Sequence, residues 1–354
     1  MEINNGCSKQ QLKEIGIFDW PELAPNFKDS NLLLGNGFSL NIAPESFQYD
    51  SIFQKFLDNC PADYGNIFKI FGTSNFESIL QKLCDTKYVN GLFGIREPRV
   101  DEAIQLLKNG LITTIHDIHP KAEEIYWDKL ERLANQVRFF SNIFTLNYDL
   151  FLYHVVMILK DQIEKNEKYR GTKEYKQLWR YSDCFWRNYE GDFHLFSSYQ
   201  DADRFRFVYY LHGALFIFRK SLDDLKLLRR SNEVELINLI GGVIQEGRMP
   251  LFVCEGSSES KLEQINSSNY LKFARRKLKY SGEKFVIFGS SLAEQDNHIF
   301  SELDQNKNHL AISIHIGTKS RETLTKIKER INNKFVNAAV YLFDSGTIFE
   351  WSVN

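Results

Sequence analysis

The sequence lacks long apolar runs and paired cysteines. Nowhere do about 18 apolar residues follow one another, so no membrane-spanning helix is expected. Residues 1–16 are polar and contain no apolar signal region, so we expect no secretory signal peptide. The five cysteines are scattered without a CxxC pair, which disfavours a zinc site or a disulfide framework. These absences together predict a cytoplasmic protein.

An excess of charge of one sign is missing as well. The formal net charge is −2 in 354 residues, so no broad nucleic-acid-binding face is expected. A chain of this length can form one large domain or two, because single cores stop growing near about 250–300 residues. Hydrophobic residues make up 43% of the chain, which is sufficient for a core of that size.

Four short apolar runs each end in small or polar residues. They lie in Leu32–Ser39, Ser141–Asp149, Phe207–Gly213 and Phe285–Ser291. An apolar run that stops at a polar cluster, before an amphipathic segment, is typical of a buried strand leading into a helix. Ligands of open parallel α/β sheets bind in the crevice outside the carboxyl ends of the strands. We therefore expect the polar residues of all four stretches to line one crevice.

Strand and helix alternate through the C-terminal half of the chain. This pattern predicts an α/β fold with a Rossmann-like, doubly wound and mainly parallel sheet. Residues 1–30 are interpreted as a polar lead-in and residues 31–354 as the domain itself. Residues 45–136 have helix-like apolar spacing, which predicts a helical insertion between the first two sheet strands. Residues 222–230 are expected to form a charged helix, and residues 255–261 a polar loop.

Two other stretches have an unusual composition. Tyr181–Ser198 is rich in aromatic residues, which either wall a ligand pocket or form a satellite core, the commoner case. Tyr270–Lys279 is expected to be a helix with strong basic content. We interpret its positive charges as a solvated helix face.

The first candidate binding residues follow the first strand. Gly35, Asn36 and Gly37, with Ser39 just beyond, form a candidate phosphate-binding turn. Glycines let the backbone approach a pyrophosphate closely, and exposed amides supply hydrogen-bond donors. The third glycine of the usual dinucleotide fingerprint is missing, so a plain tight turn explains these residues equally well.

A second candidate loop follows a later strand. Gly289, Ser290 and Ser291 suit contact with a second phosphate or with a ribose. Asp296, slightly further on, could bond ribose hydroxyls. It could also simply cap the helix that begins there, which is the better interpretation of this residue alone.

The candidates for chemistry lie after the second and third strands. The amide of Asn147, two residues beyond Thr145, can hold a water molecule or a ribose hydroxyl. Asp149 is also a good helix cap. His212 precedes Gly213, which permits close approach of a ligand, and a histidine can act as a general base near neutral pH. A lone histidine at a strand end is, however, more often structural.

A metal site is not expected. His116 and His119 are three residues apart, but this spacing without a third ligand nearby is a weak signal. We interpret both histidines as structural or exposed.

Taken in order, GNGFS, TLNYD, LHG and FGSSLAEQD resemble the sirtuin-like NAD-binding superfamily. The similarity is greatest to its bacterial branch of uncharacterised and antiphage-defence proteins. It covers the chain from Asn31 to Phe343 and depends on the order and strand context of the motifs, since each motif alone is common.

The resemblance implies cleavage of the bond between nicotinamide and ribose in NAD, with Asn147 and His212 as catalytic residues. The positions that it implies for binding NAD are Gly35, Asn36, Gly37, Ser39, Thr145, Asp149, Gly289, Ser290, Ser291 and Asp296. Glu77 resembles an acidic position in the helical insertion of the superfamily.

Two features of protein-deacetylating sirtuins are absent: the four-cysteine zinc module and the Pro-x-Phe-Arg ending of the first motif. We therefore expect an NAD glycohydrolase that needs no metal and serves as an effector of abortive-infection antiphage defence. A separate sensor protein or homo-oligomerisation would gate it. The alternative is a non-catalytic module that senses NAD, ADP-ribose or a related nucleotide and regulates a partner protein. A deacylase or ADP-ribosyltransferase ranks third.

Overall fold

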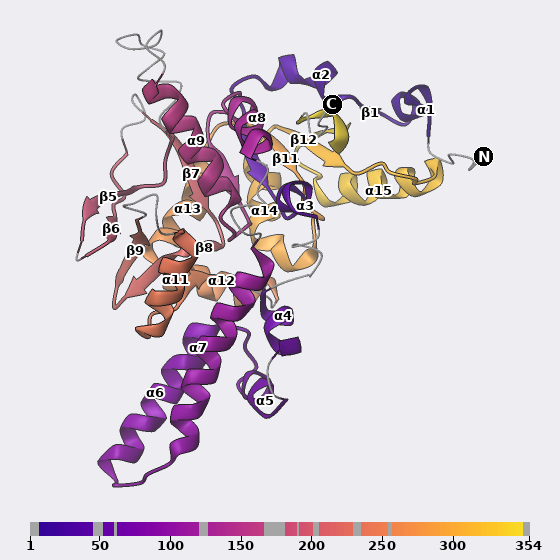
Figure 1. The fold of residues 1–354 in the computed structure, drawn as a ribbon. Helices are drawn as coiled ribbons and strands as arrows, with labels where there is room; N and C mark the ends of the chain where they lie inside the picture. The colour runs from indigo at the N-terminus through magenta and orange to yellow at the C-terminus, as the bar shows by residue number, and fades with distance from the viewer. Residues whose placement is uncertain are drawn as a thin grey trace.

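Two sheets organise the chain in the computed structural model, which describes residues 7–44, 52–59, 62–119, 127–165, 181–189, 191–200, 205–228, 235–253 and 257–349 (Figure 1). The larger sheet has eight strands and the smaller has five. Among these residues, no helix is both long enough and apolar enough to cross a membrane.

The larger sheet is parallel throughout, in the order β1-β13-β12-β11-β2-β3-β7-β4. Its strands are β1 (Ile17–Phe18), β2 (Asn31–Leu34), β3 (Ile143–Thr145), β4 (Tyr181–Ser182), β7 (Arg206–Tyr210), β11 (Lys284–Phe288), β12 (His309–Ile314) and β13 (Ala339–Asp344). The strand order and the single direction confirm the expected Rossmann-like α/β fold.

Helices cover both faces of this sheet. Leu32 and Leu34 pack into one hydrophobic cluster with α8 (Trp127–Val137) and α9 (Phe151–Lys165). Leu33, between them, packs into a second cluster with the helices of the other face, α1 (Lys9–Glu14), α13 (Asn269–Tyr280), α14 (Asn297–Asn306) and α15 (Arg321–Lys334). Successive strand residues point to opposite faces. Burial on both faces explains why the central strands are continuous apolar runs.

The expected helical insertion is present between β2 and β3. After the short α3 (Gly37–Ile42), the described residues form α4 (Ile52–Asn59), α5 (Ala62–Ile70), α6 (Phe76–Leu92), α7 (Pro98–Ile118) and α8. Figure 1 shows α6 and α7 side by side as a long pair that projects away from the sheets. The pair ends in solvent-exposed apolar residues, with Leu92 67% and Phe93 76% exposed.

The smaller sheet is antiparallel, in the order β10-β8-β9-β6-β5, and was not expected. Its strands are β5 (Phe185–Asn188), β6 (Phe193–Phe196), β8 (Gly213–Lys220), β9 (Asp223–Leu227) and β10 (Pro250–Phe252), and α11 (Leu236–Gln245) packs on β8. The aromatic stretch 181–198 supplies β5 and β6 and contributes to the core.

Two expected elements were wrong. Residues 222–228 do not form the expected helix: β9 pairs with β8, and Leu225 and Leu227 are buried while Asp223 is exposed. Residues 229–230 of the expected helix lie outside the described residues. The cross-strand partners decide the conformation of this segment. The expected polar loop 255–261 contains the start of α12 (Ser258–Ser267), where the side chain of Ser257 caps the helix by accepting the Ser260 amide.

The N-terminal residues also join the larger sheet. β1 pairs in parallel with β13, and α2 (Trp20–Leu23) and the 3-10 helix η1 (Ala24–Phe27) follow it. The ring centroid of Trp20 lies 5.0 Å from that of Phe343 in β13. The lead-in therefore adds an edge strand and an aromatic contact to the body of the fold.

Candidate functional site

Four strands of the larger sheet end at the same level. Phe288 of β11 pairs with Leu34 of β2, Leu34 with Thr145 of β3, and Thr145 with Tyr210 of β7. These four residues form one row across the sheet, so the segments that follow them leave from one edge. We call residues 35–39, 145–149, 212 and 289–298 the polar edge. The expectation that the four motifs meet at one place agrees with this register.

Two loops of the polar edge touch each other through their backbones. A Cβ atom on Gly37 would lie 2.6 Å from Cα of Gly289, and a Cβ atom on Gly35 would lie 2.7 Å from the carbonyl oxygen of Gly289. Gly289 itself has φ +69°, a conformation that side chains rarely adopt. Contact between the loops therefore requires glycine at all three positions, whatever ligand binds there.

The amides of these glycines are already occupied. The amide of Gly35 donates to the Phe288 carbonyl oxygen at 2.9 Å, and that of Gly37 to the Gly289 carbonyl oxygen at 2.7 Å. Gly289 donates to Oγ of Ser313 at 3.0 Å. The glycine amides are thus not available as phosphate donors.

Three neighbouring amides remain open. Within the described part of the chain, the backbone N–H groups of Asn36, Ser290 and Ser291 donate to no other residue. Asn36 and Ser291 are exposed, and Ser290 is half-buried. Because Gly37 and Gly289 hold the two loops together, these amides lie on adjacent turns. They are donors that these two loops can offer to an anion.

A buried hydrogen-bond network joins β2 to β3. Nδ2 of Asn147 donates to the Gly35 carbonyl oxygen at 3.0 Å and to Oγ of Ser39 at 2.9 Å. The Ser39 hydroxyl in turn donates to Oδ2 of Asp149. Burial raises the pKa of the Asp149 carboxyl. The network fixes the side chain of Asn147 and leaves its Oδ1 without a partner among the described residues.

The other polar groups of this segment also have structural partners. Oγ1 of Thr145 accepts the amide of Asn147 at 3.0 Å. Oδ1 of Asp149 accepts the amide of Phe151, the first residue of α9, at 2.9 Å. Asp149 therefore does stabilise a helix start, as its residue type alone suggested.

His212 lies at the end of β7 and is 4% exposed. Its Nε2 atom is 3.1 Å from Nε2 of His298. Burial lowers the pKa of His212 to about 3, so the ring is neutral.

The close approach at Gly213, next to His212, serves packing instead of a ligand. Gly213 has φ +75°, and a Cβ atom there would lie 1.9 Å from the Leu251 carbonyl oxygen of β10. The expected role of this glycine in ligand approach was wrong.

His298, in the first turn of α14, was missed by the sequence analysis. Its backbone amide donates to Oγ of Ser258 at 2.9 Å, and its Nδ1 lies 3.3 Å from the same oxygen. Burial lowers the pKa of His298 to about 4. The simplest proton arrangement runs from the Ser258 hydroxyl to Nδ1, and from Nε2–H of His298 to Nε2 of His212. The one feature of the sequence that could have indicated His298 is its position two residues after the candidate Asp296.

Asp296 occupies the N-cap position of α14, but its side chain makes no capping bond. Its Oδ1 atom lies 2.8 Å from Nζ of Lys261, which is 5% exposed, and 3.9 Å from Nε2 of His212. The short 3-10 helix η4 (Glu294–Asp296) holds the carboxylate there. Asp296 is therefore a charged neighbour of His212, and its expected alternative as a plain cap is wrong.

The polar edge also contains one possible ligand set for a metal ion. One nitrogen from each of His212 and His298 and one oxygen of Asp296 lie within 4.8 Å of one another. Two imidazoles and a carboxylate suit divalent transition metals. The ammonium of Lys261, 2.8 Å from that carboxylate, already neutralises it. The geometry therefore favours a hydrogen-bonded cluster over a metal centre.

The remaining candidates lie away from this cluster. His119 is buried, with Nε2 accepting the amide of Leu150 at 3.2 Å, and His116 is exposed on α7. The interpretation of these two histidines as structural or exposed is confirmed. Glu77 lies in the first turn of α6, and its side chain is outside the described residues.

The fold and the polar edge together define a Rossmann-like α/β protein. The chain belongs to the family described as domain of unknown function DUF4917, whose sequence profile matches residues 32–351. No curated protein matches the chain in sequence.

The loop contact leads to a first prediction. Gly37→Ala places a methyl group against the backbone of Gly289, so we expect a loss of about 1–3 kcal/mol in the free energy of unfolding, measured by urea denaturation. Gly242→Ala is the matched control, because Gly242 is exposed within α11 with no atom near its Cβ position. The control should gain about 0.5–1 kcal/mol. Equal stability of both variants would contradict the close contact.

The buried histidines lead to a second prediction. The folded pKa of His212 is about 3, and those of His119 and His298 are about 4, all below the unfolded value near 6.5. Their stabilising contribution is complete above about pH 6.5 and is lost as the pH falls toward 4. Between these limits, each histidine should contribute up to about 1.4 kcal/mol per pH unit to the slope of the free energy of unfolding against pH.

Urea denaturation between pH 7 and pH 4.5 measures this loss. Asp149, with its raised pKa, works in the opposite direction and reduces the slope. His119→Gln should lower the slope, whereas the exposed His116→Gln should leave it unchanged. A free energy of unfolding that stays constant over this range would exclude neutral buried histidines.

Proposed function

We propose that this protein is an NAD glycohydrolase, which cleaves the nicotinamide–ribose bond of NAD to give nicotinamide and ADP-ribose. One observation carries the proposal: Asn147 and His212 each lie two residues beyond a pair of neighbouring strand residues, Thr145 of β3 and Tyr210 of β7. A neutral imidazole and an amide fixed by Gly35 and Ser39 thus follow adjacent strands at the carboxyl edge of a parallel sheet, where such folds bind nucleotides.

The two loops suit the diphosphate of NAD. The open amides of Asn36, Ser290 and Ser291 would donate to phosphate oxygens, in place of the glycine amides, which have partners within the chain. The two loops are those expected from the sequence, but the donating amides belong to the residues beside the glycines. The glycines contribute by bringing the two loops into contact.

In the proposed reaction, a water oxygen attacks the anomeric carbon of the nicotinamide ribose as the glycosidic bond breaks. Nicotinamide takes the bonding electron pair and leaves as a neutral molecule. Oδ1 of Asn147 would accept a hydrogen bond from the water or from a ribose hydroxyl, because Nδ2 is already bound to Gly35 and Ser39. Nε2 of His212 would accept the proton released by the water.

Asp296 would support this proton transfer. Its carboxylate, 3.9 Å from Nε2 of His212, favours the protonated form of the imidazole, while burial opposes it. The nearby ammonium of Lys261 limits the effect of the carboxylate. The carboxylate would therefore lower the energy of the protonated imidazole that forms during the transfer, while burial keeps the resting imidazole neutral.

One observation favours a second candidate, a module that binds NAD or ADP-ribose without turnover. In this structure Nε2 of His212 is in contact with His298, and a pKa of about 3 makes it a weak base. Catalysis requires that substrate or water replace His298 at this nitrogen. A sensor would have no such requirement.

The third prediction separates the two candidates. Purified protein incubated with NAD should release nicotinamide and ADP-ribose, detected by chromatography. His212→Ala should lower the rate by about 10²-fold or more, the range for loss of a general base. Asn147→Ala should lower it by about 10²-fold, because the water or ribose is no longer positioned. His116→Ala, an exposed histidine on α7, should keep the rate of the unchanged protein.

Both substituted residues are buried, so thermal unfolding and NAD binding of each variant must be measured alongside. Full activity of folded His212→Ala would exclude the proposed mechanism. NAD that binds to the unchanged protein and stays intact, with products of neighbouring genes present or absent, would establish the sensor. Addition of EDTA should leave the rate unchanged, because the proposed chemistry uses no metal.

The proposal includes a role in abortive-infection antiphage defence, in which assembly or a partner protein turns on NAD depletion. The role in defence follows from the resemblance to the defence branch of the superfamily, and the observation behind assembly is the apolar end of the α6–α7 pair. Tyr88, Leu92, Phe93 and Ile95 are all more than half exposed there, at 70%, 67%, 76% and 55%. Several exposed apolar side chains near one another are typical of an interaction surface. We assign it to a second copy of the chain.

The fourth prediction tests this surface. Leu92→Glu combined with Phe93→Glu places two charges on it and should keep the protein monomeric at concentrations where the unchanged protein assembles, as measured by analytical ultracentrifugation. Val336→Glu, at a 73% exposed position after α15, is the control and should assemble normally. An unchanged protein that is monomeric at all concentrations would exclude self-assembly and transfer the gating to a separate partner.

A further inference from the structure

A cavity of about 600 Å³ lies between the smaller sheet and α13. This volume falls within the usual range of about 300–1,000 Å³ for small-molecule sites. Its lining residues come from β5, from β6 and the segment after it, from the β8–β9 turn, from the start of β9 and from α13: Arg187, Leu195, Phe196, Ser197, Ser198, Leu222, Asp223, Asp224, Asn269, Lys272, Phe273 and Arg276. None of them belongs to the polar edge. The aromatic stretch and the basic helix of the sequence analysis thus meet here.

Three cations line this cavity. Lys272 and Arg276 are one turn apart on α13, and Arg187 reaches it from β5. None of the three forms an ion pair with a carboxylate in the part of the chain that the structure describes. The interpretation of the basic residues of α13 as a solvated helix face is therefore incomplete, because Lys272 and Arg276 line a cavity. The three cations outnumber the exposed carboxylate of Asp223, which also lines the cavity, and they suit a negatively charged ligand.

The carboxylate of Asp224 is 2% exposed and has one unfilled acceptor. Its Oδ2 accepts the hydroxyl of Ser268 at 3.0 Å and the amide of Tyr270 at 2.7 Å. Its Oδ1 forms an ion pair with Nε of Arg219 at 3.6 Å but accepts no hydrogen bond. A buried carboxylate oxygen without a donor is costly. A ligand with an N–H group would satisfy it.

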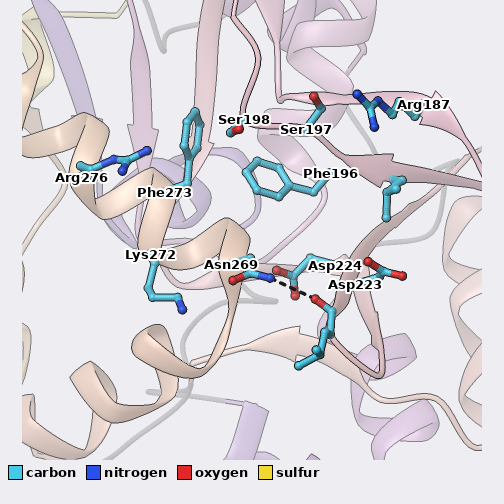
Figure 2. A pocket seen from close by; sticks show the side chains of 12 residues that line it. Arg187, Phe196, Ser197, Ser198, Asp223, Asp224, Asn269, Lys272, Phe273 and Arg276 are labelled. Carbon is cyan, nitrogen blue, oxygen red and sulfur yellow. Dashed lines mark hydrogen bonds between the residues drawn. The ribbon is translucent and has the colours of Figure 1, made fainter.

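Aromatic rings complete the cavity. The ring centroids of Phe196 and Phe273 lie 5.2 Å apart, with their planes tilted by 60°. Figure 2 shows the two rings next to each other, with Arg276 on one side of them and Arg187 on the other. Asp224 and Asn269 lie across from the rings in the same view. A flat ligand ring can pack on the phenylalanines with its edge toward Asp224.

We propose that this cavity is a second binding site, for a nucleoside phosphate whose base carries an exocyclic amino group, such as an adenine nucleotide. The base packs on Phe196 and Phe273 and donates its amino group to Asp224. The phosphates bind the three cations. The hydroxyls of Ser197 and Ser198 are available to the sugar.

Helix α13 connects this cavity to the polar edge. The backbone amide of Tyr270 donates to Asp224. The hydroxyl oxygen of Tyr270 accepts the backbone amide of Tyr210 at 3.0 Å, and Tyr210 lies two residues before His212. Arg275, further along α13, pairs at 2.5 Å with Glu302 of α14, the helix that carries His298. A nucleotide that repositions α13 would act on both histidines. This regulatory part rests on the proposed NAD hydrolysis, whereas binding at the cavity does not.

Calorimetric titration with ATP tests the site, using folded protein with both histidines unchanged. Lys272→Glu combined with Arg276→Glu should weaken ATP binding at least tenfold, and Lys326→Glu, on the exposed face of α15, should not change it. Inosine triphosphate, which lacks the amino group, should bind at least tenfold more weakly than ATP. Inorganic tripolyphosphate should also bind more weakly, since it has no ring.

Three results would overturn the proposal. They are ATP affinity that survives the double substitution, equal affinity for ATP and inosine triphosphate, and tripolyphosphate binding as tight as ATP binding. Thermal unfolding of the double variant confirms that it is folded.

A parallel assay separates this proposal from the proposed function. NAD cleavage by the unchanged protein should change at least threefold on addition of ATP, and cleavage by the Lys272→Glu, Arg276→Glu variant should not respond. If NAD is never cleaved while ATP binding still needs Lys272 and Arg276, the second site stands and the NAD glycohydrolase does not. If ATP binding is absent while Asn147 and His212 are required for NAD cleavage, the reverse holds.

Discussion

Backbone contact between two loops constrains the polar edge more than any single side chain does. Gly37 and Gly289 approach so closely that a methyl group on either would meet main-chain atoms. The contact depends on β2 and β11 being neighbours in register, because Leu34 and Phe288 end side by side. It turns the glycine amides toward partners within the chain and leaves those of the adjacent residues open. The glycines therefore act through geometry, and the anion donors are their neighbours.

The central strands could be predicted from the sequence because both faces of each are buried. Leu32, Leu33 and Leu34 alternate between two cores, so the strand is a continuous apolar run with a sharp polar end. β9 could not be predicted in the same way. Its five residues, with acidic residues at positions 223 and 224, take their conformation from pairing with β8, which lies on the other side of a tight turn.

The polar edge shows the same division. Asn147, His212 and the glycines follow strands, so their positions were predictable from strand ends alone. His298 follows no strand: it lies in the first turn of a helix, and only the tertiary contact with His212 distinguishes it from a surface residue. Asp296 was found, but its partner was not, since Lys261 comes from α12, a helix that was expected to be a loop. Long-range pairs of this kind leave no periodic signal.

Burial affects the hydrogen-bond network of Asn147 and the histidine pair of the polar edge in different ways. The chain from Asn147 through Ser39 to Asp149 is filled with internal hydrogen bonds, so it can position a ligand only with the free oxygen of Asn147. The histidine pair is held neutral by burial and joins two separate parts of the fold: His212 follows strand β7, whereas His298 lies on α14 and is bound to Ser258 of α12. A movement of α14 or α12 would change what faces Nε2 of His212, while Asn147 stays bound to Gly35 after β2. Both helices contact α13, so the part of the polar edge that depends on them is also the part connected to the cavity beside α13.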